Sequence, residues 1–533
     1  MTVTQVEEAT PDTGGATQTS STSFATEENL DDTKRRLWFW IIFAIAFVFY
    51  LQFQFWQQSS GGDRANWDYF AQVIARGGVP YKDVVNIKSP LSAYIGAAAI
   101  LLGKLFGLRD ILAIRLVFML LAALTVAFAF LVALDFFRNR KVAWLAASIL
   151  LGFTPLATLN VGGIQPKTPM VLFGLISLWA MKKDRPFAAG VWGMLSALCW
   201  QPGLLFVGAA GLAFSGYLTN WRDRKILKVI GGAMLPLAIL LVYFLLAGAL
   251  KDFYLWNIHF NATIYAAEEI RATGNFFKHF GKLLNQYFKI VNLFFYLAAA
   301  GLLFFIGREV RRSLQGGRGY WLDAAKIHAL LIVPLVYFAF CMINIQSVPD
   351  LIPLLPFVAI LAALTMVYAI EGLFTGLLND RLVTMRRRLV NWASFAVIAF
   401  CLVQSLSQAL VYKVTSPILQ DQDAAVADIV SQLQPGDKIF VYGRTDVLAL
   451  SGLTNASKYF LLDRGKDRYL DQIEAGGFQG WFERLKAERP KIVVYDRLRS
   501  TPDLDRLVIW TAVDYEPRTN AVYTYFIRKQ RPD

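Results

Sequence analysis

Charged side chains are scarce in this chain: only 17% of its 533 residues are Asp, Glu, Lys or Arg, against roughly 25% in an ordinary soluble protein. Apolar residues make up 56%, and they form recurrent runs long enough to cross a bilayer core of roughly 30 Å. This composition excludes a disordered chain and a coiled coil, and it argues against a conventional soluble enzyme. The sequence predicts a polytopic membrane protein.

Cysteine and histidine are equally rare, with three residues of each. Cys199, Cys341 and Cys401 all fall inside apolar stretches, which suits core positions and neither a disulfide framework nor a Cys-rich metal site. The sequence therefore specifies no cofactor and no metal ligand set. A divalent metal is compatible with the chain, but nothing in the sequence supports one.

The net charge is nevertheless +14, and its distribution shows which partner it suits. Lys and Arg gather at the ends of the apolar runs, in six clusters at 34–36, 138–141, 182–185, 222–228, 308–312 and 380–388. Basic clusters near span ends accumulate on the cytoplasmic side of a membrane. We therefore place all six inside, and we expect a lipid bilayer and no nucleic acid as partner.

An even number of spans must separate neighbouring clusters if all of them lie inside. This rule predicts eleven spans, at 38–56, 111–137, 142–160, 168–181, 187–202, 204–219, 227–249, 287–307, 329–344, 350–371 and 391–411. The apolar segment 90–107 contains Lys104, and counting it as a span would place the later clusters outside. We interpret it as an interfacial or re-entrant helix on the outer face.

Three regions result from this arrangement. Residues 1–36 are a Ser/Thr/Glu-rich tail that we expect to be disordered and cytoplasmic. Residues 37–411 form the transmembrane domain, with outer loops at 57–110 and 250–286. Residues 412–533 predict a small α/β domain outside, with helices at 421–433 and 482–489, strands at 438–442 and 491–495, and a hairpin over 515–528. No catalytic constellation is recognisable in this last domain.

The first outer loop carries the candidate chemistry. Asp63 follows the first span closely, and Lys88 precedes the interfacial helix. A carboxylate near a Lys at a bilayer surface suits group transfer from a phosphate-linked lipid: the carboxylate accepts a proton from an acceptor hydroxyl, and the Lys balances charge on the departing phosphate. The structural alternative is that Asp63 caps a helix over 64–76 and that Lys88 reaches towards lipid headgroups.

The order Asp63, then Gly78-Val-Pro-Tyr-Lys-Asp83, then Lys88-Ser-Pro-Leu91 resembles the first outer loop of bacterial GT-C class glycosyltransferases. These are the relatives of protein O-mannosyltransferases and of the lipid A aminoarabinose transferase. Weaker similarities follow in the same order, at 252–265 to the second large outer loop, at 349–356 to a Pro-rich late span, and at 441–445 to the first strand of the periplasmic domain. The resemblance covers nearly the whole chain.

The resemblance implies a GT-C-like fold of about eleven transmembrane helices with a C-terminal extracytoplasmic α/β domain. It implies a bacterial plasma-membrane glycosyltransferase with a cytoplasmic N-terminus. Such an enzyme transfers a hexosyl or pentosyl group from a polyprenyl-phosphate-linked donor to an acceptor glycan, lipid or protein at the outer face.

Roles carry over where residues match the motif. Asp63 stands at the position of the catalytic carboxylate, which acts as a general base or orients the acceptor, and Lys88 stands where a Lys contacts the donor phosphate. Tyr81 and Asp83 match loop-shaping positions. Further candidate substrate-binding residues are Asp68, Gln165, Lys167, His259, Arg271 and Asp350.

The chain also departs from the family pattern. Many members have a second acidic residue directly after the first Asp, where this chain has Arg64. The aminoarabinose transferase has an Asp before a Pro in another outer loop, where this chain has Gln165 before Pro166. These differences leave Asp63 as the main catalytic candidate and keep open a non-catalytic scaffold subunit of the same fold.

A lipid flippase or solute transporter is the alternative from another class. This class would be favoured by charged residues inside the spans, or by paired broken helices in two related halves of the chain. The sequence has few intramembrane charges and no inverted repeat, and transport does not require a large domain outside the membrane.

Overall fold

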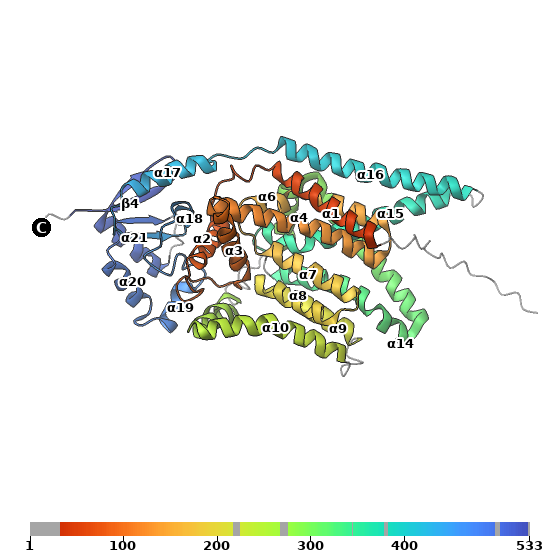
Figure 1. Ribbon diagram of the computed structural model, residues 1–533, viewed down its shortest axis with the longest axis horizontal. Helices are drawn as coiled ribbons and strands as arrows, with labels where there is room; N and C mark the ends of the chain where they lie inside the picture. The colour runs from red at the N-terminus through yellow and green to blue at the C-terminus, as the bar shows by residue number, and fades with distance from the viewer. Residues whose placement is uncertain are drawn as a thin grey trace, which may run out of the picture.

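The structure is a computed structural model that describes residues 32–216, 224–266, 276–343, 345–377, 382–495 and 501–530, with the backbone alone at 316–323 and 502. The predicted N-terminal tail therefore lies almost wholly outside the described residues, and so does Arg271. A helical bundle forms one end of the molecule and a small α/β domain forms the other (Figure 1).

The bundle helices are nearly continuous apolar runs. An α-helix satisfies its backbone hydrogen bonds within its own segment, as the interior of a membrane requires. The bundle helices are α1 Asp32–Leu51, α4 Asp110–Phe137, α5 Arg140–Leu151, α6 Thr154–Val161, α7 Lys167–Lys182, α8 Pro186–Cys199, α9 Leu204–Phe214, α10 Arg224–Leu246, α14 Leu293–Ile343, α15 Leu355–Leu377 and α16 Val383–Val411. Helix α4 lies centrally, and most of its residues are buried because it packs against α1, α5 and α7.

Helix α14 folds back on itself. His328 Nε2 lies 3.4 Å from Glu309 Oε2, whereas nineteen residues of straight α-helix would separate the two by about 28 Å. The two arms of α14 therefore lie side by side and correspond to the separate spans predicted at 287–307 and 329–344.

The eleven predicted spans correspond to described helices, but not all of these helices are long enough to cross a bilayer alone. Among the residues that the structure describes, six helical segments have the required length and apolar character, and a seventh arises if α5 and α6 count as one span. The span predicted at 142–160 is wrong as a continuous helix, because α5 and α6 meet at a bend of 53° around Gly152 and Phe153. Helices α8 and α9 are also short, so the number of membrane crossings stays a prediction.

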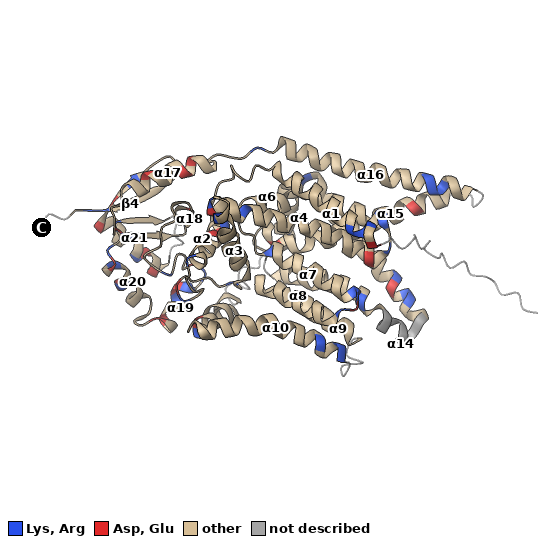
Figure 2. Cartoon of the chain, in the orientation of Figure 1, with Lys and Arg blue, Asp and Glu red and all other residues tan. Residues whose placement is uncertain are grey.

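The described residues of the basic clusters lie at the end of the bundle away from the α/β domain (Figure 2). Asp135 accepts hydrogen bonds from Arg35 at 2.8 Å and from Lys183 at 3.4 Å, and Lys225 lies 2.9 Å from Asp184. These ion pairs join the clusters at 34–36, 182–185 and 222–228. The location of these clusters at one end of the bundle agrees with an even number of spans between neighbouring clusters.

Two outer helices, α2 Gly62–Ala75 and α3 Leu91–Leu105, lie between the bundle and the C-terminal domain (Figure 1). The helix predicted over 90–107 is thus confirmed as α3. It packs closely on α4, since a Cβ added at Gly103 would lie 2.4 Å from the Ala113 methyl carbon. Its C-terminal turn exposes Leu105 and Phe106, while its location at a membrane interface stays a prediction.

The remaining outer segments are short. They are η1 Gln201–Gly203, α11 Leu250–Phe253, η2 Tyr254–His259, η3 Asn261–Tyr265, α13 Phe276–Leu283, η4 Leu284–Phe288, η5 Lys289–Asn292 and η6 Val348–Leu354.

The C-terminal domain confirms the predicted α/β pattern. Its sheet has the order β1-β2-β4-β3, with β1 Ile439–Tyr442 parallel to β2 Ile492–Tyr495, and with β4 Thr524–Arg528 antiparallel to β2 and to β3 Tyr515–Thr519. Its helices are α17 Leu419–Ser431, α18 Asp446–Ser451, α19 Lys466–Ile473, α20 Gly477–Ala487 and α21 Pro502–Asp514. The apolar strands β1 and β2 form the core of the domain, where they are almost wholly buried.

This domain docks on the first outer loop through polar contacts. Gln72 of α2 donates to the Ala449 carbonyl at 2.9 Å, and the Asn455 N–H donates to the Tyr69 hydroxyl at 3.0 Å. Val85 of the loop donates its N–H to the Lys458 carbonyl at 3.0 Å. The domain is therefore joined to the loop that carries Asp63 and Lys88.

Candidate functional site

The loop between α2 and α3 is folded around Tyr81 and Asp83. The Val79 N–H donates to Asp83 Oδ2 at 2.7 Å, and the Tyr81 N–H donates to the Val84 carbonyl at 2.8 Å. Tyr81 is fully buried with φ +69°, a left-handed conformation that non-glycine residues adopt at a cost. These two contacts fit the loop-shaping roles that the motif implies.

Lys88 projects from this loop towards the second outer loop. Its Nζ lies 4.6 Å from the centre of the Tyr265 ring, a cation–π distance. The preceding Ile87 carbonyl accepts hydrogen bonds from Asn261 at 2.6 Å and from Gln201 at 3.2 Å. Burial, together with the positive charges of Lys167 and Arg464, lowers the pKa of Lys88 to about 8, and the negative charges of Asp350 and Asp63 partly oppose this shift. Lys88 is thus anchored within a group of charged side chains.

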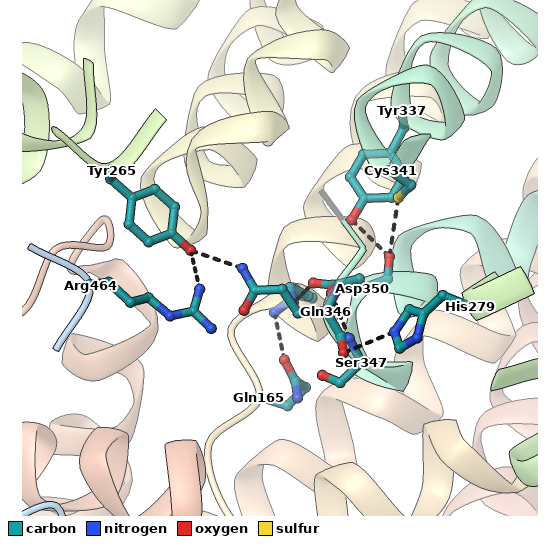
Figure 3. Close-up of polar contacts among 10 residues, drawn as sticks. Gln165, Tyr265, His279, Tyr337, Cys341, Gln346, Ser347, Asp350 and Arg464 are labelled. Atoms are coloured by element: carbon teal, nitrogen blue, oxygen red, sulfur yellow. Dashed lines mark hydrogen bonds and ion pairs between the residues drawn. The ribbon is translucent and has the colours of Figure 1, made fainter. Parts of the chain in front are cut away.

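Lys167, the first residue of α7, forms a buried ion pair with Asp350 of η6. Its Nζ lies 2.5 Å from Asp350 Oδ1 and 4.5 Å from the centre of the Trp200 ring. The other oxygen, Asp350 Oδ2, accepts the N–H groups of Gln346 at 2.8 Å and Ser347 at 3.1 Å (Figure 3). Asp350 therefore both balances Lys167 and fixes the start of η6.

A third cation comes from the C-terminal domain. Arg464 Nη1 donates to the Tyr265 hydroxyl at 3.1 Å, and Gln346 Nε2 donates to the same oxygen at 3.1 Å (Figure 3). Five chain segments far apart in sequence therefore converge, and they bring Lys88, Lys167 and Arg464 together.

Asp63 lies in the first turn of α2 with an exposed side chain. The residue at the helix N-cap is Gly61, and no side chain caps the helix there. The alternative in which Asp63 serves as the cap is therefore wrong. Within the described part of the chain, no side-chain hydrogen bond or ion pair engages Asp63, although it is close enough to raise the pKa of Lys88. Its carboxylate is available to a ligand beside the cations.

Asp68 points into the protein instead. It is 1% exposed, and its Oδ1 accepts the Ile164 N–H at 3.1 Å. The backbone at Gly163 approaches so closely that an added Cβ would lie 2.8 Å from Asp68 Oδ2. Asp68 thus joins α2 to the segment that leads into α7 and Lys167.

The other predicted residues are placed as follows. Gln165 is buried, and its Oε1 accepts the Lys167 N–H at 3.4 Å. His259 Nδ1 shares a hydrogen bond of 2.9 Å with the Tyr469 hydroxyl of α19, so it contacts the C-terminal domain. Arg271 lies outside the described residues.

No metal site emerges from the residues that the structure describes: none of them form a group of three or more His, Cys, Asp or Glu arranged to hold an ion.

Sequence reasoning missed Arg464 and Gln346. Arg464 lies in a domain without a recognisable motif, and only the neighbouring Gly465 marks a turn there. Tyr265 falls within the segment noted for its similarity to a second outer loop, but its contact with two cations depends on the tertiary fold.

Solved GT-C fold structures share this arrangement of a helical bundle and a small C-terminal domain with a sheet. ArnT from Cupriavidus metallidurans, a lipid A aminoarabinose transferase, matches in its apo state with a TM-score of 0.58 at 13% identity, over 93% of this chain and 98% of that one. ArnT from the same organism bound to undecaprenyl phosphate matches with a TM-score of 0.55 at 14% identity, over the same shares.

The Archaeoglobus fulgidus oligosaccharyltransferase, in a complex with zinc and sulfate, is more distant, with a TM-score of 0.47 at 14% identity over 85% of this chain and 68% of that one. No protein-family profile matches the sequence, and no curated protein matches it either. The ArnT matches establish the fold, and the predicted GT-C-like architecture is confirmed.

Proposed function

We propose that the protein is a membrane glycosyltransferase that transfers a sugar from a polyprenyl-phosphate-linked donor to an acceptor outside the membrane. The carrying observation is that an exposed carboxylate, Asp63, lies close enough to Lys88 to raise its pKa, while Lys88 lies in a cluster with the cations Lys167 and Arg464. The carboxylate suits proton transfer, and the cations suit binding of an anion.

The charges favour a phosphate ligand. Lys167 is balanced by Asp350 at 2.5 Å, whereas Lys88 Nζ lies against the ring of Tyr265. Positive groups held together in a partly buried site repel one another, and an anion that binds there relieves this repulsion. ArnT, which shares the fold, has been solved with undecaprenyl phosphate bound, and this supports a lipid phosphate as the anion.

The step that we propose is a displacement at the anomeric carbon of the sugar. The acceptor oxygen forms a bond to that carbon while the bond from the carbon to the phosphate oxygen breaks. Asp63 accepts the proton of the acceptor hydroxyl, and the bonding electrons leave with the lipid phosphate. The charge that grows on this phosphate is stabilised by Lys88, because a cation that is already in place costs no reorganisation during the reaction.

The orientation that we propose places the basic end of the bundle in the cytoplasm and the C-terminal domain outside the bacterial plasma membrane. The ion-paired clusters at one end of the bundle support this orientation, because Lys and Arg at span ends are retained on the cytoplasmic side.

The test uses proteoliposomes that contain the full chain, a panel of undecaprenyl-phosphate-linked hexoses and pentoses, and bacterial envelope extract as the acceptor source. Release of undecaprenyl phosphate is measured. We expect release with at least one donor, and we expect Asp63→Asn to abolish it while leaving the folded protein intact. Asp503→Asn, at an aspartate in the first turn of α21, is the matched control.

Full activity of Asp63→Asn would show that Asp63 is not the base. If the wild-type protein moves the lipid between leaflets without releasing phosphate, the protein is a flippase and the glycosyltransferase proposal is wrong.

A further inference from the structure

Arg464 is held in an unusual backbone conformation. Its φ is +56°, and that of the following Gly465 is +82°, directly before α19. A non-glycine residue in this region is strained and persists where the surrounding structure enforces it, often at ligand-binding positions. The conformation directs the Arg464 side chain out of its own domain and towards the second outer loop (Figure 3).

Arg464 and Lys88 meet at one aromatic ring. Lys88 Nζ lies 4.6 Å from the centre of the Tyr265 ring, and the Arg464 guanidinium carbon lies 5.9 Å from it. The positive charge of Arg464 contributes to the lowered pKa of Lys88, after burial and Lys167. Two cations from different domains are thus brought close enough to repel each other.

Asp463 pairs with two cations: its Oδ1 lies 2.8 Å from Lys466 Nζ, and its Oδ2 lies 3.9 Å from Arg464 Nε. The Tyr265 hydroxyl receives hydrogen bonds from both Arg464 and Gln346. The contacts of Arg464 therefore orient it into the site beside Lys88.

We propose that Arg464 binds the departing lipid phosphate together with Lys88, so that the C-terminal domain supplies part of the phosphate site. This inference rests on the proposed function and deepens it. A sugar-linked lipid phosphate is a diester with one negative charge, whereas the released monoester carries about −1.5 to −2 at pH 7. A second cation therefore matches the charge that appears only as the bond to the sugar breaks.

The C-terminal domain holds Arg464 at a fixed position relative to Lys88. The domain is joined to the first outer loop by the contacts of Gln72, Tyr69 and Val85. Arg464 should therefore bind the phosphate product more strongly than the donor, since a charge-assisted Arg–phosphate contact strengthens with the charge on the anion.

The test measures the affinity of the purified full chain in nanodiscs for undecaprenyl phosphate. We expect Arg464→Gln to weaken binding by about tenfold or more, to raise the donor KM by a smaller factor, and to lower kcat. Arg464→Lys should restore part of the affinity. Arg468→Gln is the matched control, because Arg468 is exposed two residues into α19 and its loss should leave the affinity unchanged.

Inorganic phosphate added as a competitor separates the two sources of the anion. We expect it to displace undecaprenyl phosphate only at much higher concentration, because it lacks the lipid tail. Equal potency would overturn a lipid phosphate as the ligand.

Wild-type affinity in Arg464→Gln, alongside weakened binding in Lys88→Gln, would overturn the inference. If Arg464→Gln fails to fold, Tyr265→Phe removes the hydroxyl that orients the guanidinium and should weaken binding severalfold. If no donor supports sugar transfer but Arg464→Gln loses binding of undecaprenyl phosphate, the proposed function fails while the phosphate site stands.

Discussion

The hydroxyl of Tyr81 donates a hydrogen bond of 2.7 Å to the backbone carbonyl of Lys88. Tyr81 is fully buried, so the bond fixes the cation-bearing end of the loop to the loop's own turn. Tyr81→Phe removes the bond at a cost of about 1 kcal/mol. We expect the donor KM to rise about fivefold with kcat nearly unchanged. Tyr254→Phe, at an exposed tyrosine of η2, is the control, and an unaltered KM in Tyr81→Phe would contradict the positioning role.

Phosphate binding should weaken as pH rises through about 8. A Lys with a lowered pKa is charged below that pKa and neutral above it, and the pKa of Lys88 is about 8. The second ionisation of a phosphate monoester is complete near neutral pH, so the ligand does not titrate in this range. The affinity for undecaprenyl phosphate, measured from pH 7 to pH 9.5, should fall by up to about tenfold per unit above pH 8.

Lys88→Arg is the control for this pH profile, because Arg stays charged throughout the range. Its affinity should be nearly independent of pH. The same decline in the wild type and in Lys88→Arg would assign the titration to another group.

The Lys167–Asp350 pair should be important for stability. Both side chains are 12% exposed, so Asp350→Asn leaves a mostly buried ammonium group without its counter-charge, at a cost of about 3 kcal/mol. Lys167→Met in the same chain should recover part of this loss. Thermal unfolding in detergent measures both effects. Glu488→Gln, which breaks the exposed pair with Lys438, should cost less than about 1 kcal/mol, and an equal cost for Asp350→Asn would contradict the argument.

The sequence predicts the parts of the site that lie close together in the chain. Asp63, Tyr81 and Lys88 belong to one connection between apolar runs, and the order of charged, turn and apolar residues is enough to group them there. The pattern of apolar runs likewise predicts the helices, and the alternation of short segments predicts the C-terminal sheet. Element type follows from local periodicity, and so it can be derived without tertiary information.

The rest depends on long-range contacts. Arg464 lies almost four hundred residues after Lys88, and nothing in its own segment indicates a partner. The bend between α5 and α6 was missed because Gly152 and Phe153 lie within an apolar run that reads as one helix. The hydrogen bond from the Ile164 N–H to Asp68 likewise depends on how α2 packs on the bundle.

Asp68 should make the free energy of unfolding depend on pH, and this dependence should be absent in Asp68→Asn. Burial raises the pKa of Asp68 from 3.8 to about 6, so between these values the folded state binds more protons than the unfolded state. Stability conferred by the protonated carboxyl is therefore present at pH 4 and lost as pH rises through 6. A shift of about two units corresponds to about 3 kcal/mol. Asp68→Asn keeps an acceptor for the Ile164 N–H without this loss.

The measurement is thermal unfolding of the wild type and Asp68→Asn from pH 4 to pH 7. The variant should gain stability relative to the wild type as pH rises. Gly163→Ala is the companion variant: its methyl group would meet Asp68 Oδ2 at 2.8 Å, at a φ of +141°, so it should destabilise the protein at every pH. Because Gly163 leads into α7, it should also raise the donor KM by displacing Lys167. Parallel stability curves for the wild type and Asp68→Asn would show that the Asp68 carboxylate does not titrate in this range.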